Sequence, residues 1–231
     1  MDDLSLLSIV ADTSFTYDTR GRMLLTNEPL PSARRPAPRL WIGHARAGTV
    51  VRFGCALPDS LAEHLTVILG DEPVTPELTR PPRALPAIRS ALVPIARETA
   101  GPEYRFPGQL PAAPEAIAVM EENRELARDT FPWLLNEVAH WQPCFAIVRD
   151  GQAVSVCFSS RIGPGACAAG VETLPEFRGR GYASDATVAW AAAVRRTDRV
   201  PFYGTGWENV ASRGVARRLG LVMFGARMSW D

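Results

Sequence analysis

The sequence predicts an α/β protein of the α+β type, in which a Pro-rich N-terminal unit precedes a more regular unit of strands and helices. Two observations predict this organisation. Fifteen of the 20 prolines lie within residues 29–114, and only five follow. From Pro114 onward the apolar residues switch between strand and helix periodicity, in the order β, α, β, β, β, α, β, α, β. We therefore expect one unit at residues 1–110 and a second at residues 111–231.

The N-terminal unit contains the patterns of two strands and one helix. Residues 39–45 and 49–57 have the apolar and β-branched composition of strands. Residues 59–70 form a helical pattern, with Asp59 as the candidate N-cap and Gly70 past the end. The connections are expected in the two segments richest in proline, residues 28–38 and 72–86.

The C-terminal unit has sharper signals. Residues 116–120 form a short strand pattern, and residues 122–141 indicate one or two helices interrupted near Pro132, because proline removes a helical hydrogen bond. Residues 144–160 are two strand patterns joined at Asp150-Gly151, which is a strong hairpin signal. The remaining elements are a strand at 165–174, a helix with apolar Ala183, Ala186, Trp190 and Val194 at helical spacing, a strand at 201–207, a helix at 209–220 and a strand at 221–230.

Composition excludes several classes of function. The 25 basic and 25 acidic residues balance, so no overall field draws the chain to nucleic acid or to an anionic membrane. Every basic residue except the histidines is arginine, which excludes a Lys-dependent phosphate loop and a Schiff-base mechanism. The four cysteines form no C-x-x-C pair and the three histidines have no metal-ligand spacing, so we expect free thiols and no metal site. We therefore expect a cytoplasmic protein with neither a signal peptide nor a membrane anchor.

One stretch carries the clearest chemical signal. Residues 171–190 read VETLPEFRGRGYASDATVAW, a strand that enters a turn with Gly179 and Gly181 and continues into a helix. Such a junction gathers free backbone N–H groups and the positive end of the helix dipole, so it can bind an anion. An ordinary exposed turn would also explain the glycines and arginines of this stretch. A dinucleotide-binding fingerprint fits less well, because four residues separate the strand from the glycines.

This stretch resembles the acetyl-CoA site of the GNAT superfamily of N-acetyltransferases. Arg178 to Ala183 match its Q/R-x-x-G-x-G/A pattern, and Pro175 matches the proline that precedes it. A second motif follows at the expected distance, in Asn209, Ser212 and Gly220-Leu221. The resemblance covers residues 111–231 and leaves the N-terminal half unrecognised. It implies a GNAT fold, with a mixed, splayed β-sheet flanked by helices and acetyl-CoA (coenzyme A) as cosubstrate.

The resemblance also implies which residues hold the coenzyme. Arg178 and the backbone amides of the turn would hold the pyrophosphate, and the backbone of the preceding strand would pair with the pantetheine arm. Val171 would place an N–H on the thioester carbonyl. The cofactor-binding residues so implied are Val171, Thr173, Arg178, Gly179, Arg180, Gly181, Tyr182, Ala183 and Asn209.

Acyl transfer to an amine needs a base for the amine and a proton source for the departing thiolate. The candidate bases are Glu172, in the predicted strand at 165–174 that would hold the coenzyme, and Glu208, just after the predicted strand at 201–207. Strand alternation places Glu172 on the face opposite Val171 and Thr173, and a solvated carboxylate is the alternative reading of both acids. Tyr203, in the strand at 201–207, is a candidate to line the acceptor pocket, and burial explains it equally well.

The proton source is less clear from the sequence. Many members of the family carry a tyrosine acid seven residues after the motif asparagine, where this chain has Ala216. Members that resemble the ribosomal-protein and protein N-terminal acetyltransferases have serine at the place of Ser212. This implies an acid or thiol-orienting role for Ser212, with capping of the first helical turn as the alternative.

We therefore expect an acetyl-CoA-dependent N-acetyltransferase that moves the acetyl group directly to an acceptor amine of a small molecule or a peptide. A non-catalytic acyl-CoA-binding module and a dinucleotide-dependent oxidoreductase are the alternatives. The acceptor side would come from residues 122–141 and from the N-terminal unit, which could instead mediate a homodimer. That unit or a partner could also cover the sheet edge left by the last strand.

Overall fold

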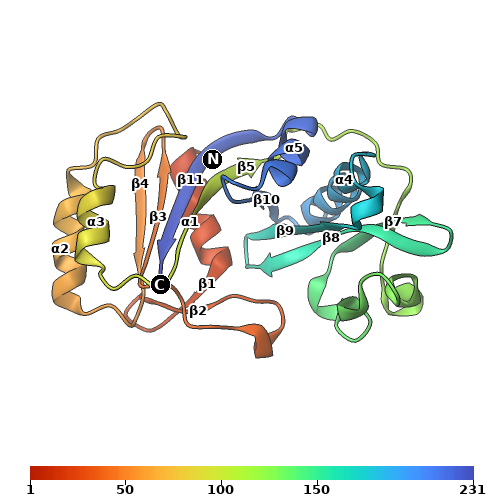
Figure 1. Cartoon of the computed structure of the whole chain (residues 1–231), viewed down its shortest axis with the longest axis horizontal. Helices are drawn as coiled ribbons and strands as arrows, with labels where there is room; N and C mark the ends of the chain where they lie inside the picture. The colour runs from red at the N-terminus through yellow and green to blue at the C-terminus, as the bar shows by residue number, and fades with distance from the viewer.

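The computed structural model describes all residues, 1–231, and its main feature is one mixed sheet (Figure 1). Every neighbouring pair is antiparallel except β9 and β10, which are parallel. In spatial order the nine strands are β4 (Gly48–Phe53), β3 (Leu40–Ala45), β11 (Val222–Trp230), β5 (Glu98–Arg105), β10 (Val200–Gly204), β9 (Ala166–Thr173), β8 (Gln152–Ile162), β7 (Cys144–Arg149) and β6 (Ala116–Ala118).

Helices cover both faces of this sheet (Figure 1). Helices α2 (Asp59–Gly70) and α3 (Leu85–Ala91) flank the β3–β4 end, and α4 (Tyr182–Arg195) packs on β6 to β10. Helix α1 (Asp3–Ser14) packs against β3, β4, β8 and β9. The other elements are a two-stranded sheet of β1 (Phe15–Tyr17) and β2 (Met23–Thr26), helix α5 (Val210–Arg218), and the 3-10 turns η1 (Pro31–Ala33), η2 (Glu121–Ala127), η3 (Pro132–Leu134), η4 (Val138–Trp141) and η5 (Pro175–Phe177).

The sheet runs through the boundary that composition suggests near residue 110. Strands β3, β4 and β5 precede that boundary, yet β5 lies between β10 and β11, and β3 pairs with the other edge of β11. The expectation that N-terminal residues cover the edge of the last strand is therefore confirmed. The two units differ in composition but share one sheet.

Strand β5 was not predicted, because its centre reads Gly101-Pro102, two residues that are unusual in a strand interior. The glycine is needed there. A Cβ on Gly101 would lie 1.7 Å from the carbonyl oxygen of Thr205. The close approach of these two backbones brings β5 against the loop that follows β10, so it helps to shape the site.

Other predicted elements agree with the structure in part. The hairpin is confirmed, with Asp150 and Gly151 both at positive φ (49° and 78°), as a type I′ turn requires. The prediction of one or two helices over residues 122–141 is wrong, because the segment forms the 3-10 turns η2, η3 and η4. Their aromatic side chains Trp133 and Trp141 pack edge-to-face on Phe158, which favours compact turns over a continuous helix.

The predicted N-cap of α2 is also wrong. Pro58 is the N-cap residue and makes no side-chain cap hydrogen bond, whereas Asp59 begins the helix. The Asp59 carboxylate instead pairs with Arg20 and Arg22 of the N-terminal segment. Helix α1, for which the sequence offered no element, starts at a true cap, because Asp2 Oδ1 accepts the Ser5 N–H at 2.8 Å.

Buried side chains hold α4 firmly on the sheet. Trp190, expected to be a core residue, is fully buried, and its Nε1 donates to Ser159 Oγ on β8 at 3.1 Å. This hydrogen bond ties the middle of α4 to β8. All four cysteines are free thiols, of which only Cys55 is exposed. None of the helices combines the length and the apolar composition that crossing a bilayer would need.

Candidate active site

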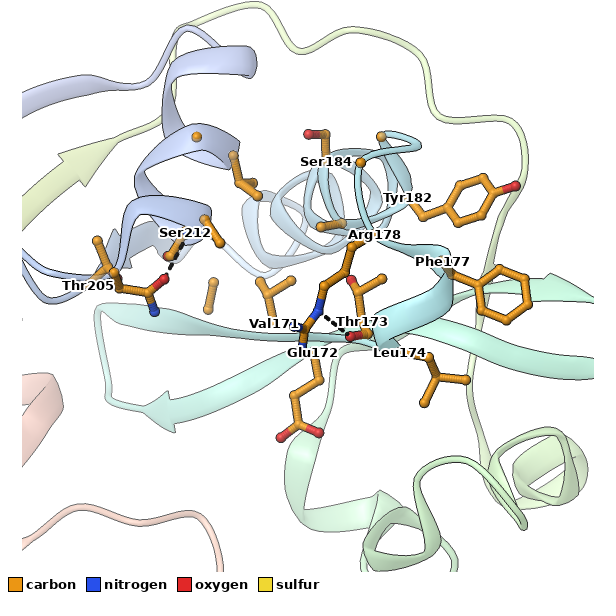
Figure 2. A pocket seen from close by; sticks show the side chains of 18 of the residues that line it. Val171, Glu172, Thr173, Leu174, Phe177, Arg178, Tyr182, Ser184, Thr205 and Ser212 are labelled. Atoms are coloured by element: carbon orange, nitrogen blue, oxygen red, sulfur yellow. Dashed lines mark hydrogen bonds between the residues drawn. The ribbon is translucent and has the colours of Figure 1, made fainter.

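Strands β9 and β10 separate after a short parallel contact, and a slot opens between them. Their pairing is limited to residues 166–168 with 200–202. Beyond it, Tyr203 and Gly204 pair with β5, whereas β9 continues to pair with β8 alone. A cavity of about 1110 Å³ occupies this divergence (Figure 2), lined by β9, β10, η5, the first turn of α4, one side of α5 and residues around the start of η3. We call this cavity the slot.

The free edge of β9 presents backbone groups to the slot. The Leu174 N–H donates to Val154 O on β8 at 3.0 Å. Because successive residues of a strand direct their N–H and C=O groups to opposite sides, those of Val171 and Thr173 face away from β8 and into the slot. Arg178 Nε donates to the Thr173 carbonyl at 3.3 Å, which agrees with this orientation. An extended chain could pair with this edge as an added strand.

The start of α4 has the features of an anion site. Gly181 is the N-cap with φ 92°, and Gly179 has φ 77°, so both adopt a left-handed conformation that glycine tolerates best. None of the five consecutive N–H groups of residues 179–183 donates a hydrogen bond within the protein. The positive end of the α4 dipole adds to their field. These donors, aligned beside a cavity long enough for an extended ligand, fit a pyrophosphate.

The arginines around this turn differ in position. Arg178 lines the slot. The side chain of Arg180 turns away, stacks over the Phe177 ring at 5.2 Å and donates to Glu176 O, so Arg180 can contribute only its backbone N–H. Arg218 of α5, which the sequence analysis missed, also lines the slot, and its Nη2 lies 2.8 Å from where a Cβ of Gly181 would be. A distant helix thus supplies a second guanidinium at the turn.

Asn209 and Ser212 meet at the start of α5, as the motif spacing implies. Asn209 Oδ1 accepts the Ser212 N–H at 3.0 Å and so caps the helix, which leaves the Asn209 amide nitrogen as a donor at the slot. Ser212 Oγ lies 2.8 Å from the hydroxyl of Tyr203, and both residues line the slot. Burial raises the pKa of Tyr203 to about 12, against the opposing effect of the Ser212 hydrogen bond. The phenol therefore carries its proton near neutral pH.

From the sequence, Tyr203 is expected only to line the acceptor pocket, with no part in proton transfer. The position where many family members carry a tyrosine acid is Ala216, which is buried. Here a tyrosine from β10, rather than from α5, brings its hydroxyl to the serine. Only the packing of α5 against β10 reveals this pairing, because the two residues belong to different elements.

Of the two candidate bases, Glu172 lines the slot and Glu208 does not. Glu172 is exposed, and its side chain leaves β9 on the side opposite Val171 and Thr173, as strand alternation predicts (Figure 2). Glu208 is also exposed, folds back over Gly206 and does not line the slot. Their assignment as bases stays a prediction; Glu172 lies at the slot, but its carboxylate is exposed and directed away from Val171 and Thr173.

A third carboxylate, which the sequence analysis missed, lies nearer the divergence of the strands. Glu103 of β5 faces Gly204 of β10 in the strand register. A Cβ on Gly204 would lie 2.7 Å from both Glu103 carboxylate oxygens. Burial raises the pKa of Glu103, and its partner Arg227, whose Nη1 lies 2.5 Å from Oε1, opposes that rise.

Comparison with known proteins agrees with this geometry. The family model of the acetyltransferase (GNAT) domain matches residues 93–222, more than half of the chain. This protein therefore belongs to the GNAT acetyltransferase family. The match begins before β5, so it includes a strand that composition assigned to the N-terminal unit. No match was found among curated proteins.

Several solved structures are similar to this chain. A GNAT-family acetyltransferase from Novosphingobium aromaticivorans is 22% identical with a TM-score of 0.48, over 59% of this chain and 65% of that one. One from Colwellia psychrerythraea is 14% identical with a TM-score of 0.48, over 64% and 62% of the two chains. A GCN5-related N-acetyltransferase-like protein from Streptococcus suis is 14% identical with a TM-score of 0.48, over 84% and 85%. The chain thus spans less than two thirds of the length of the first two.

Proposed function

We propose that this protein binds acetyl-CoA in the slot and transfers the acetyl group directly to an acceptor amine. The observation that carries the proposal is the combination, in one cavity, of five free N–H groups at the start of α4 with the free edge of β9. The first feature suits a pyrophosphate and the second suits the extended, amide-containing pantetheine arm. Few ligands other than a coenzyme A thioester present both groups.

Acetyl-CoA, when bound, supplies an activated acetyl thioester whose leaving thiol titrates at about 8.5. The chain supplies the rest. The Val171 N–H, directed into the slot, can donate to the acyl oxygen as negative charge develops there, a role whose loss typically costs about 3–4 kcal/mol. The Tyr203 hydroxyl, held by Ser212, can deliver a proton to the departing sulfur.

A non-catalytic acyl-CoA-binding module remains the second candidate, and Ala216 is the feature that favours it. A binding module has no need for a proton donor at the thiol end of the slot. The Tyr203–Ser212 pair supports catalysis instead, because it places a protonated hydroxyl inside the slot. Amine acetylation above background would exclude the binding-only function.

The proposal is tested by calorimetric titration of acetyl-CoA into the wild-type protein and Gly181→Glu. The new carboxylate would meet the Arg218 guanidinium and occupy the anion site itself, so we expect binding to be abolished. Gly165→Glu is the matched control. It adds the same charge in the exposed β8–β9 turn, where a Cβ meets no atom within 4 Å. Unchanged affinity in a folded Gly181→Glu variant would refute the assignment of the slot.

A further inference from the structure

A second cavity, of about 1150 Å³, meets the slot at the point where β9 and β10 separate. Ala169 of β9 and Gly204 of β10 line both cavities. The second one lies towards the α1 side of the sheet, whereas α4 and α5 bound the slot. Most of its other walls come from the first 110 residues, including α1, the segment after β2 and the ends of β5. We call it the acceptor chamber.

Two ion pairs on the sheet form the floor of the acceptor chamber. Arg161 of β8 pairs with Glu28 through Nη1 and Nη2, and Arg227 of β11 pairs with Glu103. All four side chains are largely buried, with the two arginines 27% and 29% exposed. The pKa of Arg161 is lowered by burial and further by the neighbouring charge of Arg227, against the effect of Glu28. Both guanidinium groups line the acceptor chamber, and their like charges oppose one another.

The charge of the chamber lining is unbalanced. Five arginines and three acidic side chains contribute to it. Two of the arginines, Arg35 and Arg39, have no carboxylate partner; Arg39 donates only to backbone carbonyls. An anionic group placed between Arg161 and Arg227 would relieve their mutual repulsion and could accept hydrogen bonds from both, which is a strong arrangement for a carboxylate.

Glu103 lies between this floor and the slot. Its carboxylate touches Gly204, which lines both cavities, and its side chain is 5% exposed. A primary amine enters as an ammonium ion, and a desolvated carboxylate at the junction both attracts that ion and accepts its proton. The distance from floor to junction is short, because Arg227 contacts Glu103 directly.

We propose that the acceptor chamber takes a small primary amine that carries a carboxylate, with the carboxylate bound by Arg161 and Arg227 and the amine at Glu103. This proposal rests on the proposed function of the slot. In the reaction the ammonium ion gives one proton to Glu103, and the neutral nitrogen forms a C–N bond to the acetyl carbon while the C–S bond breaks. Tyr203 gives its proton to the departing sulfur, and the second proton of the nitrogen, released once the C–N bond has formed, returns to the Tyr203 oxygen.

Matched pairs of primary amines test the proposal, each pair an amino acid and the amine that lacks its carboxylate. Binding of each to the protein is measured by calorimetry, and turnover by thiol release from acetyl-CoA. We expect the carboxylate-bearing member to bind and react at least 10-fold better. In Arg161→Gln this preference should disappear while acetyl-CoA affinity stays unchanged. Arg80→Gln, an exposed arginine outside both cavities, is the control.

Two further variants test the proposal independently, in case Arg161→Gln does not fold. Arg227→Lys keeps the positive charge beside Glu103 but loses the guanidinium fork, so it should lower affinity for the carboxylate-bearing amines and leave the amines without a carboxylate unaffected. In Glu103→Gln, affinity for the ammonium form of the amine should fall, and the acidic limb of the pH profile of kcat/KM should be lost. Equal use of both members of each pair, or an unchanged preference in Arg161→Gln, would overturn the proposal. Absence of turnover with coenzyme A bound would overturn it too and leave the slot assignment intact.

Discussion

Replacement of Arg218 by alanine isolates the contribution of α5 to the anion site. Its guanidinium lies against Gly181 at the start of α4, and it makes no ion pair within the protein. Arg217 is its natural control, because it is the preceding residue of the same helix, is also exposed and does not line the slot. Both substitutions remove one positive charge and alter helix propensity equally.

The magnitude follows from the contact that Arg218 would make. A hydrogen bond to a charged group contributes about 1.5–3 kcal/mol, so Arg218→Ala should weaken coenzyme A binding about 10- to 150-fold. Arg217→Ala should weaken it less than about 3-fold, since an exposed charge at a distance is screened. Neither variant should change the melting temperature appreciably, because neither residue is buried.

The affinities of each variant for coenzyme A and for pantetheine are measured by calorimetry. Coenzyme A contains the pyrophosphate and pantetheine does not, so Arg218→Ala should affect only coenzyme A. The reasoning is refuted if the two variants lose affinity equally, or if Arg218→Ala weakens pantetheine as much as coenzyme A. In either case the guanidinium at Gly181 has a structural role instead.

Three further outcomes follow from buried groups. Tyr203→Phe should lower kcat about 100-fold with unchanged coenzyme A affinity, whereas Tyr104→Phe, 6.4 Å away by ring centroids and outside the slot, should be neutral in the same assay. Burial lowers the pKa of His44, so the unfolded chain takes up that proton first and the free energy of unfolding should fall as the pH drops through about 6.5. His44→Gln should flatten that dependence in urea titrations at pH 7.5 and 5.5, and an unchanged slope would contradict the assignment. Only Cys55 should react rapidly with a thiol reagent in the native protein, and rapid reaction of a second thiol would show that the core opens.

Local patterns predicted the parts of the site that are local in the chain. Gly179 and Gly181 at the start of a helix, and Asn209 three residues before Ser212, are adjacent in sequence and need no tertiary information. The hairpin at Asp150 was predictable for the same reason. In each case the backbone conformation follows from the residue type itself.

The parts that the sequence did not predict depend on distant pairing. Glu103 reaches the junction only because β5 inserts between β10 and β11, and its Gly101-Pro102 centre hides the strand signal. Arg218 meets Gly181 only through the packing of α5 beside α4. The 3-10 turns of residues 121–141 follow from aromatic packing on Phe158, which no local periodicity encodes.

A crystal structure of the complex with coenzyme A tests the central claim most directly. The account predicts pyrophosphate oxygens within hydrogen-bond distance of the N–H groups of residues 179–183, and a pantetheine arm paired with the free edge of β9. The sulfur should lie in the divergence of β9 and β10, beside Tyr203 and open to the acceptor chamber at Gly204. A coenzyme bound elsewhere, or a sulfur directed away from that junction, would contradict the account.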